Sequence, residues 1–161
     1  MSETRTGDKL ANLLKKANEV EMAFENMANW EAYVSVKGEE FRQILFRLIS
    51  DSQRHKNILN SLISKIKMSN SHDLIPLTPR VFDFKNRHEL EIMEEIGRYE
   101  KLAFDLYTNI MEALKNSETK LLLCDENDVD LLTSSLQTLI SEEKSHIDLV
   151  SKYSGRFQRL R

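Results

Sequence analysis

The chain has few of the residues that interrupt helices. Its 161 residues include only four glycines and two prolines, and both prolines fall between positions 76 and 79. Glycine and proline are the strongest local breakers of regular structure, so their scarcity predicts long helices joined by few loops. With 40% hydrophobic and 30% charged residues, we expect one folded domain over residues 1–161, with its core at about residues 8–154.

Cysteines, long apolar runs and excess positive charge are also missing. Cys124 is the only cysteine, so no disulfide can form within the chain, and a reducing cytoplasm fits best. The first 20 residues are too polar for a signal peptide, and no apolar run approaches the length of a membrane span. The net charge of −3 gives no indication of nucleic-acid binding. We therefore expect a cytoplasmic protein without membrane or nucleic-acid partners.

Apolar residues recur at helical spacing in four stretches, which predicts an all-α protein. Residues before Asp8 are expected to form a disordered tail. Capping residues and breakers place the four helices at Thr6 or Asp8 to about Tyr33, Glu39 to Met68, Asn86 to Leu114, and Asp125 or Asn127 to Ser154–Gly155. Asn86 and Glu89 have the spacing of a capping box at the start of the third helix.

The connections between these stretches differ in length. Ser69–Lys85 contains both prolines and is long enough to travel the length of a bundle, whereas the other two connections are shorter. This order predicts a four-helix bundle with one long crossover between the second and third helices. The crossover is apolar for an exposed segment, with Leu74, Ile75, Leu77, Val81, Phe82 and Phe84. Such a surface should be buried along the bundle or against another chain, and we predict a homodimer.

The fourth helix carries two ionisable residues within its apolar stripe. Glu143 and His146 lie among Leu139, Ile147 and Val150 at helical spacing. A carboxylate and an imidazole that face a core are costly unless a partner satisfies them. Metal coordination is one solution, since Glu-x-x-His directs an oxygen and a nitrogen at one point. The alternative is a buried hydrogen bond between Glu143 and His146.

The other three helices carry matching residues near the middle of their stripes. These are Glu21, His55 and Glu100. Each also has an ordinary interpretation, because a stripe edge tolerates an acid and a core histidine is often only hydrogen-bonded. Four such positions at one depth of one core are far less common by accident than any one of them. Together they predict a shared polar centre.

This arrangement resembles the ferritin-like superfamily, and within it the rubrerythrin-like di-iron carboxylate proteins. Those proteins present Glu on the first helix, Glu-x-x-His on the second, Glu on the third and Glu-x-x-His on the fourth. The third helix also matches a frequent local pattern of that family, Glu-x-x-Ala-x-x-x-Tyr, through Glu100, Ala103 and Tyr107. The resemblance covers residues 8–154.

The resemblance implies a dinuclear iron site, with manganese or zinc as alternatives. Glu21 and Glu100 would be terminal ligands, Glu143 a bridge, and His55 and His146 the nitrogen ligands. Tyr107 would be either a hydrogen-bond partner of a ligand or an ordinary core tyrosine. The implied function is oxidation of ferrous iron with oxygen or peroxide, as in a ferroxidase or a peroxidase-type oxidoreductase.

Three departures from the family pattern weaken that function. Ser52 stands where the second helix should carry the glutamate of Glu-x-x-His, so one bridge is missing and the second metal position is weakened. The neighbouring Asp51 could replace it, although it points roughly 60° away from the stripe. The extra third-helix carboxylate is absent, since Gly97 and Ala103 flank Glu100. Without a Cys-x-x-Cys pair, we expect no rubredoxin-like domain and a separate electron donor. The alternative is a redox-inactive relative with one metal or none, acting as a scaffold or partner-binding bundle.

Overall fold

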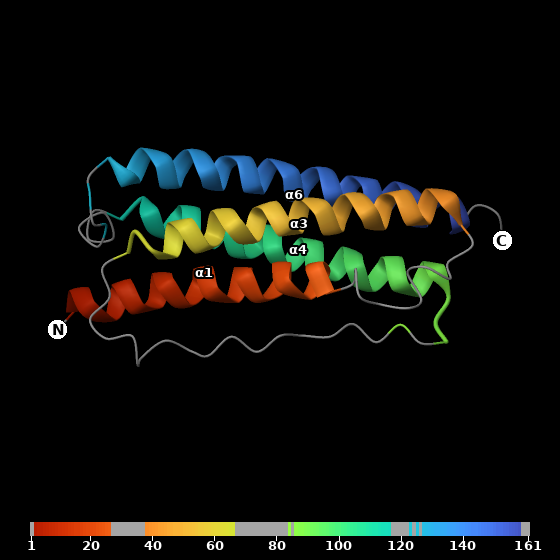
Figure 1. Ribbon diagram of the computed structural model, residues 1–161, viewed down its shortest axis with the longest axis horizontal. Coiled ribbons are helices and arrows are strands. Elements are labelled where there is room, and N and C mark those ends of the chain that lie inside the picture. Colours follow the sequence, from red (N-terminus) through yellow and green to blue (C-terminus); the bar gives the residue numbers. More distant parts are fainter. Residues whose placement is uncertain are drawn as a thin grey trace.

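The structure is a computed structural model that describes residues 2–26, 38–66, 84, 86–116, 123, 125 and 127–158. These residues form four helices: α1 Ser2–Asn26, α3 Glu39–Ile63, α4 Glu89–Leu114 and α6 Asp128–Gln158 (Figure 1). The described part of the chain contains no strand and only one isolated β-bridge, between Ile66 and Leu123. The prediction of an all-α protein with four helices is confirmed for this part. None of the described helices has the length and apolarity needed to cross a membrane.

The predicted helices for α1 and α6 are too short at one end, and the predicted helix for α3 is too long. α1 begins at Ser2, so the expected tail before Asp8 is wrong, and α6 continues through Gly155 to Gln158. Extending an existing helix costs little, and a single glycine costs only about 1 kcal/mol. α3 ends at Ile63 and not at Met68, since Ile66 pairs with Leu123 instead of continuing the helix. The predicted part of the first helix beyond Asn26 lies outside the described residues.

The start of α4 lies three residues later than expected. Asn86 has φ 61°, which is a left-handed conformation that a right-handed helix cannot include. His88 takes the N-cap position instead, and its backbone N–H donates to the Glu91 carboxylate over 3.3 Å. The predicted capping box of Asn86 and Glu89 is therefore wrong. A box of the same kind occurs two residues further along the chain.

Contacts at the helix ends fix the helix directions. At one end of the bundle, the Tyr153 ring near the end of α6 lies 6.0 Å from the Phe41 ring near the start of α3. The Tyr153 hydroxyl donates to Glu89, the first residue of α4, over 3.0 Å. At the other end, Lys65 just beyond α3 pairs with Asp128 at the start of α6 over 2.9 Å. α3 and α4 therefore begin at the same end, and α6 runs opposite to both (Figure 1).

This arrangement leaves the end of α3 and the start of α4 at opposite ends of the bundle. The predicted crossover between them, Ser69–Lys85, lies outside the described residues except for Phe84, and it stays a prediction. Laterally, α1 packs mainly against α3, and α6 packs mainly against α4, while α3 and α6 contact each other much less. The molecule is thus two antiparallel helix pairs, α1–α3 and α4–α6, that face each other.

The core between the pairs is apolar above and below a polar middle. Buried apolar side chains come from all four helices, including Leu14, Leu48, Ile96 and Leu139. At mid-height the buried residues are instead ionisable or polar: Glu21, Ser52, His55, Glu100, Glu143 and His146. Because buried charges are costly without partners, this layer is where the fold positions a site.

Candidate metal centre

All five predicted site residues lie in this buried layer, and each exposes 1% of its surface or less. The helical stripes explain their placement, since the same spacing that buries the apolar residues of each helix turns these side chains inward. α1 contributes Glu21, α3 contributes His55, α4 contributes Glu100, and α6 contributes Glu143 and His146. The structure brings all five together.

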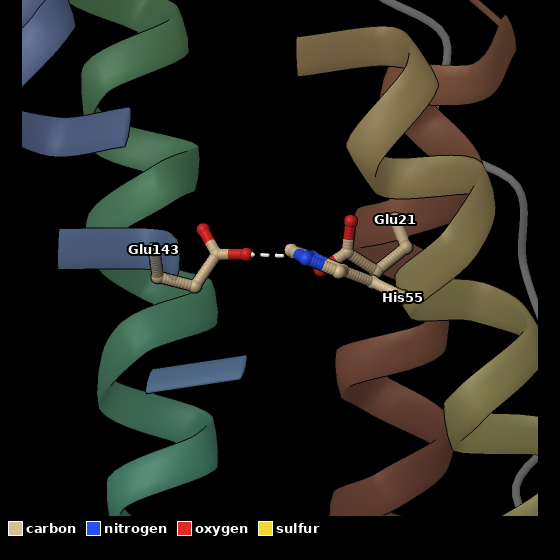
Figure 2. Close-up of side chains that lie close together, drawn as sticks. All are labelled: Glu21, His55 and Glu143. Carbon is tan, nitrogen blue, oxygen red and sulfur yellow. Dashed lines mark hydrogen bonds and ion pairs between the residues drawn. The ribbon is translucent and has the colours of Figure 1, made fainter. Parts of the chain in front are cut away.

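The five side chains form two groups that share one member. Glu21, His55 and Glu143 form one group, and Glu100, Glu143 and His146 form the other. Within each group, one ligand atom from every residue lies within 4.8 Å of the others, which is close enough to surround one metal ion. Figure 2 shows the first group, with Glu143 facing His55 and Glu21 across the centre. Glu143 is therefore placed between two potential metal positions.

Both histidines direct the same ring nitrogen at the centre. His55 Nδ1 lies 2.9 Å from Glu143 Oε1 and 3.3 Å from Glu21 Oε1. His146 Nδ1 lies 3.2 Å from Glu100 Oε2 and 3.8 Å from Glu143 Oε2. The two rings stack at 24°, with their centroids 5.8 Å apart. Two imidazole nitrogens thus approach the shared carboxylate from neighbouring positions.

The outer nitrogen of each histidine bonds a carboxylate from the opposite helix. His55 Nε2 lies 2.7 Å from Glu142 Oε2 on α6, and His146 Nε2 lies 2.9 Å from Asp51 Oδ2 on α3. A carboxylate here accepts a hydrogen bond from Nε2–H, which leaves Nδ1 as the nitrogen that can bind a metal. Asp51 therefore does not replace the missing bridge, because its oxygen lies on the outer side of a histidine ring.

The sequence analysis missed Glu142, and it considered Asp51 only as a replacement bridge. Both residues stand four positions before a histidine of the site, Asp51 before His55 and Glu142 before His146. This repeated offset was the available signal. It was easy to overlook, because both side chains lie at the edge of an apolar stripe and are partly exposed, 24% for Asp51 and 30% for Glu142.

The Tyr107 hydroxyl on α4 donates a hydrogen bond to Glu21 Oε1. Its ring is fully buried and stands edge-on to His55, with the centroids 6.5 Å apart. Burial raises the Tyr107 pKa well above its usual value, so the hydroxyl remains a donor. Of the two readings of Tyr107, the structure favours the partner of a candidate ligand over an ordinary core tyrosine.

The acids and histidines shift one another's pKa values. Burial lowers the histidine pKa, but hydrogen bonds to the carboxylates outweigh burial and raise the pKa to about 10 for His55 and about 11 for His146. Burial raises the pKa of Glu21 and of Glu100, and it would raise that of Glu143 as well. Hydrogen bonds from His146 and His55 instead lower the Glu143 pKa to about 2. The centre therefore requires positive charge, which protons supply when no metal does.

Two carboxylate oxygens of the centre have no recorded donor. Glu100 Oε1 and Glu143 Oε2 are buried and have no hydrogen-bond partner. A buried acceptor without a donor costs free energy and needs an explanation. A cation between these oxygens would provide one, because carboxylate oxygens and imidazole nitrogens are common ligands of divalent metals. The residues present therefore fit a metal ion.

Ser52 is buried, with 2% of its surface exposed, one turn before His55 on α3. It holds the position that Glu143 holds before His146 on α6. A serine hydroxyl carries no charge, so α3 supplies no carboxylate to the centre. The site offers three carboxylates in all: Glu21, Glu100 and Glu143.

Comparisons with known proteins identify no family for this chain. No family model matches the chain. Neither a curated protein nor a solved structure is significantly similar to it. The resemblance to the ferritin-like superfamily therefore rests on the residues of the centre and their order along the chain.

Proposed function

We propose that this chain is a ferritin-like protein that binds two metal ions, iron in the first place, and oxidises ferrous iron with oxygen or peroxide. One observation carries the proposal: Glu143 belongs to both of the buried groups that could hold a metal. A carboxylate has two oxygens, so one side chain in this position can bind two ions at once.

The donor types support a choice of metal. Three carboxylates and two imidazoles are typical of iron and manganese, and zinc also accepts both kinds of ligand. No sulfur ligand occurs among the five residues, which argues against a site for soft metals. Manganese and zinc remain the alternatives to iron, and the metal titrations described below decide among the three.

The residues of the chain would each have a definite role. His55 and His146 would bind one ion each through Nδ1, while Glu142 and Asp51 hold their Nε2 protons. Tyr107 would fix the rotamer of Glu21. The apolar layers above and below would exclude water. Bound iron would supply the redox chemistry, in which each ferrous ion gives one electron to the oxidant.

Ser52 favours a second candidate, a redox-inactive relative with one metal or none that acts as a scaffold or partner-binding bundle. Two ions of charge +2 face only three carboxylates, so one positive charge lacks a partner in a buried site. A single ion would leave no such excess. The two candidates differ in how many ions the chain binds.

An anaerobic titration of metal-free protein with ferrous iron tests the proposal. We expect two ions per chain, followed by oxidation when oxygen or peroxide is added, measured by absorbance and by Mössbauer spectroscopy. Parallel titrations with manganese and zinc give the metal preference. Binding of one ion or none, without oxidation, would support the redox-inactive candidate instead.

The proposal retains four expectations about the wider protein: a long crossover, a homodimer, a separate electron donor and a cytoplasmic location. The apolar residues that suggested the homodimer lie outside the described residues, except for Phe84. Phe84 exposes only 2% of its surface within a single chain. Its burial therefore needs no second chain, and light scattering at micromolar concentration decides the oligomeric state.

A further inference from the structure

The outer contacts of the two histidines meet at one arginine. Arg54 on α3 donates from one guanidinium nitrogen to Glu142 Oε2 over 2.7 Å and lies 3.4 Å from Asp51 Oδ1. Glu142 is the carboxylate on His55, and Asp51 is the carboxylate on His146. Within the described part of the chain, no other side chain is recorded in contact with both of these carboxylates.

The result is a continuous chain of contacts from one histidine to the other. It runs from His55 through Glu142, Arg54 and Asp51 to His146, and it crosses between α3 and α6 three times. These two helices otherwise contact each other sparsely, so few other groups tie them together at this height. The position of each histidine ring therefore depends on a carboxylate whose own position depends on Arg54.

We propose that Arg54 is a positioning residue that makes the two metal positions depend on each other. The inference rests on the proposed function, because it concerns how the candidate ligands are held. Arg54 touches neither group of ligands, and it acts by fixing Glu142 and Asp51. The fixed carboxylates hold the Nε2 protons, and both Nδ1 atoms then point at Glu143. Losing the direct outer partner of a metal-binding histidine typically costs about 10- to 100-fold in metal affinity, and Arg54 contacts both such partners.

The surroundings of Arg54 offer no second link between the two carboxylates. Arg54 lies at the edge of a hollow of about 320 Å³ between α3 and α6, which is also lined by Asn57, Ile58, Ser61, Leu62, Leu131 and Ser135. None of these neighbours is recorded in contact with Glu142 or Asp51. Without the guanidinium, Glu142 and Asp51 would turn towards water, since both are already partly exposed.

Arg47 provides a matched control. It lies two turns before Arg54 on the same helix and is similarly exposed, with 55% of its side chain accessible against 47% for Arg54. Its guanidinium lies 3.7 Å from Asp51 and 3.4 Å from the Ser145 hydroxyl, and no contact with Glu142 is recorded. Arg47→Met and Arg54→Met therefore remove the same charge and a similar area, but only Arg54→Met breaks the link between the histidines.

The first measurement is a Co²⁺ titration of the full chain, in which visible absorption reports the binding of each ion. We expect Arg54→Met to weaken both cobalt positions by about tenfold or more and to change the absorption bands, which report ligand geometry. Arg47→Met, which removes no contact with Glu142, should leave the affinity of the His55 position within about twofold of the native protein. Arg54→Lys keeps the charge but replaces the planar guanidinium with a compact ammonium group of different reach, so it should recover only part of the affinity.

The second measurement needs no metal. In NMR spectra of the metal-free protein, the Nε2 protons of His55 and His146 should exchange slowly because each is held by a carboxylate. Arg54→Met should speed the exchange of both. Glu142→Ala should affect chiefly His55, and Asp51→Ala chiefly His146, although each substitution lies on the opposite helix. Circular dichroism confirms that each variant is folded.

The outcomes separate the inference from the function. If the native protein binds no cobalt, the proposed function fails and the inference fails with it. If the native protein binds two ions and Arg54→Met weakens neither, or only one, then Arg54 does not couple the positions and the inference alone is overturned. Unchanged exchange of both histidine protons in Arg54→Met would overturn it as well.

Discussion

The centre has two halves, one on α1 and α3 and the other on α4 and α6. Their residues are similar, but the hydrogen bonds to their buried carboxylates differ. In the α1–α3 half, Glu21 accepts a hydrogen bond from the Tyr107 hydroxyl, and Ser52 lies three residues before His55. In the α4–α6 half, Glu100 keeps one oxygen without a partner, and Glu143 stands before the histidine. In both halves, an outer acid lies four residues before the histidine: Asp51 before His55 and Glu142 before His146. The α1–α3 half is therefore the more complete without a metal, whereas Glu100 and Glu143 each keep one buried oxygen without a hydrogen-bond partner.

This difference indicates how two ions would be shared between the halves. The position beside His146 has an intact Glu-x-x-His and the unpartnered oxygens of Glu100 and Glu143. The position beside His55 lacks the second bridge, because Ser52 is neutral. We expect one tighter position at His146 and one weaker position at His55.

The largest effect should come from Glu143→Gln, which breaks both halves at once. Removing an outer partner costs up to about 100-fold in metal affinity, so losing a shared direct ligand should cost more than about 100-fold at both positions. Metal analysis after equilibrium dialysis measures the loss. Glu94→Gln, at an exposed position on α4, is the control and should bind normally. Retention of two ions by Glu143→Gln would mean that Glu143 is not a bridge.

Ser52→Glu should make the halves equal. A fourth carboxylate would balance the charge of two divalent ions, so the weaker position should tighten by about tenfold or more, and ferrous oxidation should become faster. Without metal, the new buried charge should lower the free energy of unfolding. A ferrous titration with stopped-flow oxidation compares this variant with Ser52→Ala, which should behave like the native chain. Equal affinities and fast oxidation in the native chain would contradict the weakened position.

Acidity should weaken metal binding in both halves. The pKa values of about 10 for His55 and about 11 for His146 mean that both rings carry a proton at neutral pH when no metal is bound. Each ion must displace a proton, so affinity should rise by about tenfold per pH unit for each proton released. The sign follows from the raised pKa values, since raising the pH towards 10 removes the competitor. Zinc titration calorimetry between pH 6 and 8 in two buffers counts the protons.

The smallest expected effect is that of Tyr107→Phe, which makes the α1–α3 half resemble the other. Glu21 Oε1 would lose its hydroxyl donor and keep only the longer contact of 3.3 Å with His55 Nδ1. The loss should cost about 1 to 3 kcal/mol in the free energy of unfolding without metal, measured by urea denaturation. Metal at the His55 position should restore part of that cost. No change in the metal-free stability would show that Tyr107 does not satisfy Glu21.

Most of the centre could be predicted because it depends on spacing along single helices. Glu21, His55, Glu100, Glu143 and His146 stand at core positions of regular helices, and helical spacing is read directly from a sequence. The roles of Asp51, Glu142 and Arg54 could not be predicted in the same way. Their partners lie on the opposite helix, and spacing along one helix says nothing about the rotation of its neighbour.

The helix ends show a second limit. The start of α4 was misplaced because Asn86 adopts a left-handed backbone conformation, which a capping pattern alone does not reveal. The early start of α1 and the late end of α6 were missed because breakers are only modestly unfavourable inside a helix that is already formed. None of these errors moved a residue of the centre, since the candidate ligands lie away from the helix ends.

The crossed pattern of outer contacts also has a consequence for folding. Each histidine sits on one hairpin of helices and takes its outer acid from the other, so neither hairpin can assemble a complete site before the two dock. Bound ions would then act on the docking step and leave each separate hairpin unchanged. They would slow complete unfolding and hardly affect fraying at the helix ends, so amide protons along the α3–α6 face should gain the most protection from hydrogen exchange.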